Sequence, residues 1–221
     1  MGISERRERE KVERRKAILN CAKELIVAQG VEHVSMENIA IKAELSKATV
    51  YLYFSSKEEL LNEICEEAAK TFHEHLTSFN KAGLKGMIAL KYLWHGYVKL
   101  FGSSNEMIIV FQVRNYLDSW LPIVSMEGKN QSSYVDDILL ATKALIDECK
   151  AEGVFAPDLD STVATRLLLS LFSIIVEQAS RLPLEVRGSP AVIEEMTNTF
   201  QVIIRGFARE GIEHSVLNIR T

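Results

Sequence analysis

Between Ser46 and Lys57 the chain carries hydroxylic, aromatic and cationic side chains at helical spacing. A helix starting after Ser46 turns Val50 and Phe54 inward, since residues four apart share one face. The side chains left on the outward face are Lys47, Ala48, Thr49, Tyr51 and Tyr53. Because such groups can reach base edges and phosphate oxygens, the run predicts a surface that reads nucleic acid.

Catalytic and metal-binding spacings are missing from the sequence. The three cysteines, Cys21, Cys65 and Cys149, lie far apart and are odd in number, so they predict reduced thiols. His73 and His75 point to different faces of a helix, and there is no Glu-x-x-His pair. The chain also lacks a glycine-rich phosphate loop and a GxSxG nucleophile motif. We therefore expect neither an enzyme nor a metal or cofactor site.

Composition favours a globular protein with a basic N-terminal part. The 221 residues are 47% hydrophobic and 25% charged. Residues 1–57 carry a net charge of +3 and residues 58–221 one of −7, which suits a small anion-binding unit on an acidic body. The longest nearly apolar stretch, Leu167 to Val176, is shorter than the ~20 residues of a membrane span. With a charged rather than apolar N-terminus, this predicts a cytoplasmic protein without membrane association.

Apolar residues recur at a period near 3.6 along almost the whole chain, and no alternating strand is found. Gly30 is placed to end the first helix, while Ser35, Ser46 and Ser56 are placed to cap the next three. The polar stretch Ser125–Ser133 predicts a loop. The expected fold is all-α with about nine helices, over residues 8–29, 36–43, 47–54, 56–78, 84–101, 105–121, 133–152, 160–181 and 190–210.

The second and third of these helices are short and separated by the turn Ala43–Ser46. Helices of about eight residues are marginal alone, so the pair must pack on the helix over 8–29. Together these three helices predict a helix-turn-helix unit over residues 1–57. The remaining helices form a second domain over residues 58–221.

The stretch from Arg14 to Leu61 resembles the tetracycline-repressor (TetR) family of transcriptional regulators. Residues 46–60 are similar to that family's Ser-x-Gly-Thr-hydrophobic-Tyr-x-Tyr/His-Phe segment followed by Ser-Lys-Glu-x-Leu. Glu44 and Ala48 stand where many relatives have glycine. The first departure suggests a turn that tolerates a non-glycine conformer, and the second places a methyl group against the DNA.

This resemblance implies roles for eight DNA-binding residues. Base edges would be contacted by Lys47, Ala48 and Thr49, and phosphates by Ser35, Ser46, Tyr51, Tyr53 and Lys57. The charged segment Arg6–Lys16 alternates basic with acidic side chains, which leaves two interpretations open. It is either a surface helix with i,i+4 ion pairs, or an arm that lies along the DNA.

The resemblance also implies that the C-terminal domain binds a small molecule and forms a homodimer through its last two helices. Both of those helices have apolar surface wider than one stripe, which predicts burial on two sides. The expected interface residues are Leu167, Leu171, Ile174, Met196, Phe200, Ile203 and Phe207. A mainly apolar pocket with polar anchors His95 and Arg114 is expected among Trp94, Tyr97, Met107, Phe111, Tyr116, Trp120 and Phe172.

The expected function is a dimeric regulator, a repressor by resemblance, that binds a palindromic double-stranded operator and is released by a small-molecule effector. The alternative is a helical-bundle enzyme or small-molecule-binding protein that has kept a vestigial DNA-binding head. A steep dependence of DNA affinity on salt would distinguish the two, because phosphate contacts release counterions.

Overall fold

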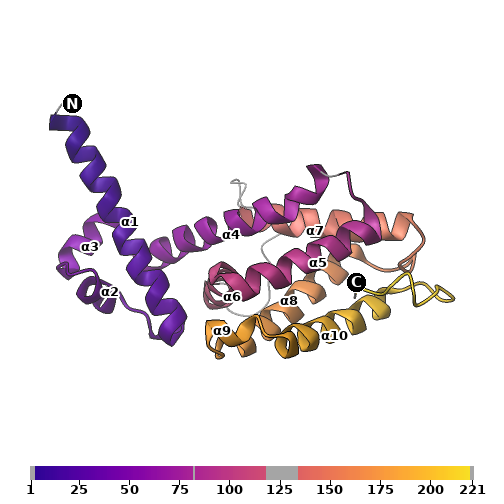
Figure 1. The fold of residues 1–221 in the computed structure, drawn as a ribbon. Helices are drawn as coiled ribbons and strands as arrows, with labels where there is room; N and C mark the ends of the chain where they lie inside the picture. Colours follow the sequence, from indigo (N-terminus) through magenta and orange to yellow (C-terminus); the bar gives the residue numbers. More distant parts are fainter. Residues whose placement is uncertain (1–2, 82, 118–133, 220–221) are drawn as a thin grey trace.

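The computed structural model describes residues 3–81, 83–117 and 134–219, which form ten α-helices, one 3-10 helix and no β-strand. The all-α prediction is therefore confirmed. The elements are α1 (Ile3–Gln29), η1 (Val31–His33), α2 (Met36–Lys42), α3 (Lys47–Tyr53), α4 (Lys57–Lys81), α5 (Gly86–Ser103), α6 (Glu106–Leu117), α7 (Tyr134–Ala151), α8 (Ser161–Ser180), α9 (Leu184–Arg187) and α10 (Pro190–Phe207). Figure 1 shows α1–α3 at one end, and α4 leading from them into the bundle of α5–α10. We call α1–α3 with η1 the head, and α5–α10 the body.

Most helix boundaries lie within three residues of the predicted ones, but α1 begins at Ile3, five residues earlier than predicted. The one-turn helix α9 was not predicted. The segment between Pro183 and Gly188 has four residues, which is too short for a helical period to distinguish it from a loop. The end of the helix predicted over 105–121 and the loop predicted over Ser125–Ser133 lie outside the described residues.

The predicted caps explain where the head helices begin and end. Gly30 has φ +82° and donates its N–H to the carbonyl of Ile26, which ends α1. The Ser35 hydroxyl accepts from the Asn38 N–H in a full capping box at α2. At α4 the Ser56 hydroxyl accepts from the Glu59 N–H, and the Glu59 carboxylate accepts from the Ser55 N–H and hydroxyl.

A continuous apolar core joins head and body through α4. In the head, Ile18, Ile39, Val50 and Phe54 are fully buried, so the two short helices are held by packing against α1. Helix α4 then packs against α5, α6 and α7. Helix α4 thus links the two parts of the chain, and α6 adds contacts with α1 and η1.

Among the described residues, one helix, α8, is long and apolar enough to cross a bilayer by length and composition alone. Core helices of globular proteins can have the same length and composition. Here α8 packs against α6, α7 and α10. A little under half of its apolar window, 44%, is buried in this single chain, which leaves one of its faces open.

The start of α5 is held by two carboxylates, one from α7 and one from the turn that follows it. Glu148 Oε2 accepts the Gly86 N–H at 2.8 Å and Glu152 Oε2 accepts the Met87 N–H at 3.1 Å. These bonds satisfy helix N–H groups that would otherwise lack partners, and negative charge is favourable at a helix N-terminus. Gly86 itself has φ +51°, and a Cβ atom there would overlap the Glu152 carboxylate.

We expect Gly86→Ala to destabilise the protein by about 2–4 kcal/mol, since it adds left-handed backbone strain and displaces a charged cap. Gly83→Ala is the matched control: φ is +69°, but a Cβ atom there would meet nothing within 4 Å. Thermal unfolding of both variants separates strain from the lost cap. Equal losses of stability in the two would show that the Glu152 contact contributes nothing.

Candidate nucleic-acid interface and ligand cavities

The N-terminus of α3 is fixed by its own hydroxyl side chains. Ser46 Oγ accepts the Thr49 N–H at 3.0 Å and lies 2.7 Å from Thr49 Oγ1. Both side chains are therefore engaged in capping, as the sequence predicted for Ser46. The N–H groups of the first turn of α3 keep the positive end of the helix dipole next to this face.

The turn between α2 and α3 is a Schellman motif with a glutamate in the left-handed position. Leu45 donates its N–H to the carbonyl of Ala40, and Glu44 donates to that of Ile41. Glu44 has φ +55° and is the sole non-glycine residue with positive φ in the described ranges. The expected non-glycine turn is thus observed, at a cost of roughly 1–2 kcal/mol relative to glycine.

The outward face of α3 gathers five of the eight predicted DNA-binding residues. Lys47, Ala48 and Tyr51 are exposed, and Ser46 and Thr49 lie beside them at the start of the helix. Leu52 was missed from the sequence, although it is 83% exposed, on the same side of α3 as Ala48. Its position four residues after Ala48 could have placed it on the outward face from the sequence. An exposed leucine beside a methyl group can contact thymine C5-methyl groups.

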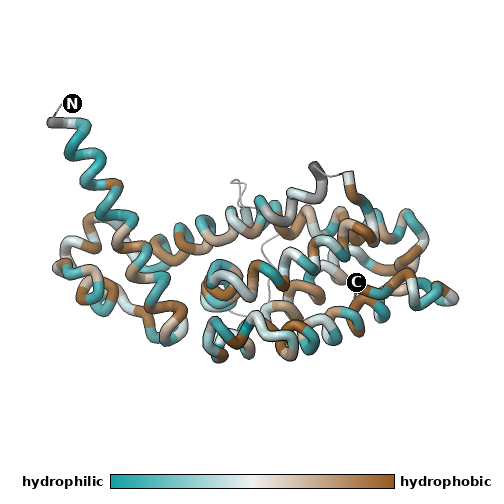
Figure 2. The backbone as a smooth tube through the Cα atoms, in the orientation of Figure 1, coloured by the Kyte–Doolittle hydropathy of each residue, from teal (hydrophilic) through white to brown (hydrophobic). Residues whose placement is uncertain are grey.

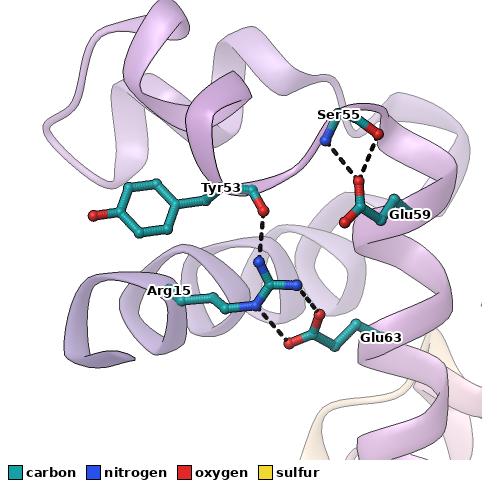
Figure 3. A network of polar contacts seen from close by, with 5 residues as sticks. All are labelled: Arg15, Tyr53, Ser55, Glu59 and Glu63. Carbon is teal, nitrogen blue, oxygen red and sulfur yellow. Dashed lines mark hydrogen bonds and ion pairs between the residues drawn. The ribbon is translucent and has the colours of Figure 1, made fainter. Parts of the chain in front are cut away.

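Arg15 on α1 links the end of α3 to α4 (Figure 3). Its Nη1 donates to the Tyr53 carbonyl oxygen at 2.5 Å, while Nε and Nη2 bind both carboxylate oxygens of Glu63. The guanidinium also lies 4.1 Å from the centre of the Phe54 ring. The hydrogen bond and charge of Glu63 raise the pKa of Arg15. This contact positions the recognition helix, a role that its place in the charged N-terminal run did not reveal.

The other three residues predicted to contact phosphate lie off the outward face of α3. Ser35 is exposed but its hydroxyl is used in the α2 cap. Tyr53 is half-buried, and its ring points away from the Arg15 network (Figure 3). Lys57 Nζ donates to the Val31 carbonyl oxygen at 3.0 Å and to Tyr116 Oη at 3.2 Å, over the Tyr116 ring. In this conformation Lys57 bridges the head to α6, and its contact with phosphate remains a prediction.

The N-terminal half of α1 projects beyond the rest of the head (Figure 1) and is strongly hydrophilic (Figure 2). Arg6 and Glu10 form an i,i+4 ion pair at 2.9 Å, as the surface-helix interpretation expects. The same projection leaves the segment open to a long partner. Both interpretations of Arg6–Lys16 therefore remain predictions.

Three of the predicted pocket residues meet in the centre of the body. The rings of Trp94, Tyr97 and Phe172 pack together with Phe200, and the Trp94 and Phe200 rings are stacked at 4.3 Å. We call these four residues the aromatic core. The free space beside it is about 10 Å³, the size of one water molecule. Tyr97 Oη is buried there without a hydrogen-bond partner among the described residues, and burial raises its pKa well above the usual value.

The other predicted pocket residues lie elsewhere. Met107 is buried, and His95 is exposed with Nδ1 2.8 Å from the Lys91 carbonyl oxygen, so His95 is not a polar anchor of the aromatic core. Arg114 is half-buried and lines neither this space nor the cavity described next. Trp120 lies outside the described residues.

Phe111 and Tyr116 line a larger cavity between head and body, about 710 Å³ in volume. Its head wall is residues 27–33, from the end of α1 and from η1. The body wall comes from α6, from the end of α8, and from the segment that leads into α9. The sequence could not predict this cavity, because its walls come from segments about 80 and 150 residues apart.

Of the seven predicted dimer residues, only the outward-facing ones can contact a partner. Leu167 and Ile174 on α8 are 47% and 51% exposed, with Leu171 and Ile203 half-buried. In contrast, Met196, Phe200 and Phe207 are buried inside their own chain, and their assignment to an interface is corrected. Both faces of α10 carry apolar residues, so periodicity alone did not separate core from surface.

The segment that contains α2 and α3 is similar to known bacterial regulators. Residues 18–64 match the family described as bacterial regulatory proteins, tetR family. The HTH-type transcriptional regulator UidR of Escherichia coli (strain K12) is 26% identical over 167 residues, which cover 71% of this chain and 76% of UidR. The matched segment contains α2, α3 and the start of α4, and so includes all of the outward α3 face.

Solved structures share the fold over most of the chain. The fatty acid degradation regulator FadR from Bacillus halodurans aligns with a TM-score of 0.62 and 20% identity, over 89% of this chain and 97% of that one. A TetR family transcription regulator from Marinobacter aquaeolei aligns with a TM-score of 0.63 and 18% identity, over 93% and 100%. At these identities the likeness concerns the fold, and the ligands of those proteins are not transferred by it.

Proposed function

We propose that this chain is a member of the tetR family of bacterial regulatory proteins, and that it is a homodimeric transcriptional repressor that a small molecule releases from a palindromic operator. The observation that carries the proposal is the outward face of α3, where Lys47, Ala48, Thr49, Tyr51 and Leu52 stand together on a capped, well-packed helix. Its sequence lies within the segment that matches the family. Two such helices in a dimer would enter successive major grooves.

The base-reading residues are proposed to be Lys47, Thr49 and Leu52. Selection of binding sites from a random duplex library, followed by titration at several salt concentrations, tests DNA binding itself. A log–log salt slope near zero would favour the alternative of a binding protein or enzyme with a vestigial head. UidR is named as a regulator, which supports the regulatory function here.

We expect Lys47→Ala and Thr49→Ala each to cost about 1–3 kcal/mol at particular operator positions and to relax the sequence preference there. Leu52→Ala should reduce the preference for thymine at one position. Lys42→Ala is the control, because Lys42 on α2 pairs with Glu24 and lies off the α3 face. If the three α3 variants lose affinity equally on all sequences, α3 positions the protein and does not read bases.

The proposed dimer interface is the open stripe of α8, formed by Val163, Leu167, Leu171 and Ile174, together with Ile203 on α10. The α8 residues recur every three or four positions, so they lie on one face of the helix. Exposed apolar stripes of this length mark interaction surfaces.

The proposed effector site is the aromatic core. A ligand must open it, because its free space holds no more than one water molecule. The buried Tyr97 hydroxyl supports this assignment, since an unpaired buried polar group costs free energy that a ligand acceptor or donor would recover. Emission from Trp94, which stacks on Phe200, should change when a ligand enters.

A further inference from the structure

The cavity between head and body carries a buried cation, Arg187, whose hydrogen bonds within the described residues go to neutral oxygens and not to a carboxylate. Arg187, at the end of α9, is 5% exposed and lines this cavity. Its three hydrogen bonds go to neutral oxygens: the carbonyls of Leu182 and Ser180 and Oδ1 of Asn105. Burial lowers the pKa of Arg187, as expected for a desolvated cation, and the negative charge of Glu185 offsets this effect only in part.

A second polar group in the same cavity lacks a partner. Gln112 on α6 lines the cavity, and its Oε1 is buried without a hydrogen bond to any described residue. A buried acceptor of this kind is stabilised when a donor reaches it. The cavity therefore presents a buried positive charge and an unsatisfied acceptor together.

The rest of the lining sets the ligand's size and shape. Apolar side chains of Val27, Phe111, Val176 and Leu182 form part of the wall, so an aromatic body would be buried against them. The volume of about 710 Å³ lies within the range of small-molecule sites. Glu32 and Glu177 also line the cavity but are exposed, so water screens their charge far more than it screens that of Arg187.

We propose that this cavity is a second ligand site, separate from the aromatic core, for a small aromatic anion that also carries a hydrogen-bond donor. The anionic group is held by Arg187, the donor by Gln112, and the ring by the apolar wall. Because Val31 and Tyr116 line the cavity and both bind Lys57, a bound molecule contacts the residues that join head to body. Occupancy of the site then fixes the orientation of the head.

The test uses 1-anilinonaphthalene-8-sulfonate, which has a sulfonate, an N–H donor and an aromatic body, and which fluoresces when bound. N-phenyl-1-naphthylamine is the matched probe without the sulfonate. Both are titrated against the full chain in the absence of DNA, so that the result does not depend on operator binding. The variants are Arg187→Met and Gln112→Leu, with Arg205→Met, an exposed arginine on α10, as the control.

We expect Arg187→Met to weaken binding of the sulfonate about tenfold and Gln112→Leu several-fold, since both remove hydrogen bonds to the probe. The uncharged amine should change less than about twofold on Arg187→Met, and Arg205→Met should affect neither probe. A thiol introduced at the head wall by His33→Cys should be protected from alkylation by the sulfonate. Protection of this thiol tests ligand binding in the cavity even if Arg187→Met fails to fold. Equal effects of Arg187→Met on both probes, or an unprotected thiol, would overturn the proposal.

Discussion

Leu167→Arg and Ile174→Arg are each expected to convert the proposed dimer to monomers and to lower operator affinity by at least about a hundredfold, the factor that joining two binding heads contributes. Each side chain is about half exposed in the single chain, so the subunit can fold with a charge at that position. In a two-fold interface the new charge would be buried against its own copy and against apolar residues. Analytical ultracentrifugation and operator titration measure the two effects.

The control for this prediction is Ile88→Arg, which adds the same charge at a residue of α5 that is 66% exposed and distant in sequence from α8. Added positive charge alone should strengthen non-specific binding to DNA. A loss of affinity confined to the α8 variants therefore reports assembly. If Leu167→Arg stays dimeric while folded, the interface lies on another face.

Arg15→Met is expected to lower operator affinity tenfold or more and to destabilise the head by about 1–2 kcal/mol, a value discounted because Arg15 and Glu63 are each about one-third exposed. The change frees the Tyr53 carbonyl and the Phe54 ring from the only side chain that ties them to α1 and α4 in the described polar network. The recognition helix would then adopt several orientations, and ordering it would cost binding free energy. Operator titration and chemical unfolding measure both quantities.

Lys23→Met is a matched control, because Lys23 and Glu67 pair α1 with α4 at 2.6 Å without touching α3. It should change operator affinity less than about twofold, as is typical of exposed ion pairs. Glu63→Gln adds a second check, since removing a negative charge should strengthen attraction to phosphate. Weaker binding by Glu63→Gln indicates positioning of α3, whereas stronger binding would contradict it.

Lys57 and His95 make contacts that the local sequence did not indicate, for related reasons. Lys57 lies in the family-like segment, but its contact with Tyr116 joins residues 59 positions apart, and no local pattern reports such a pair. His95 was assigned to a pocket by its aromatic neighbours in sequence, yet neighbours on a helix point in different directions. In both cases the residue type suggested a polar contact, but the sequence did not show in which direction the side chain points.

The sequence by itself determined the helices of this protein other than the one-turn helix α9. Helical periodicity, the caps at Ser35, Ser46 and Ser56, and the stop at Gly30 are local features, since each depends on residues within four positions. The same holds for the outward face of α3, because the period of a short helix assigns its inner and outer sides.

Only the tertiary structure decided which apolar surfaces are core and where empty space remains. Burial of Met196 and Phe200, exposure of Ile174, and the cavity between η1 and α8 depend on packing among distant helices. The hydrophobic effect that drives this packing is non-directional and acts between segments far apart in the chain. A short stretch of sequence therefore does not show which helices will pack together. The link from Arg15 to Tyr53 and Glu63 is of the same kind, because three helices must meet before it can form.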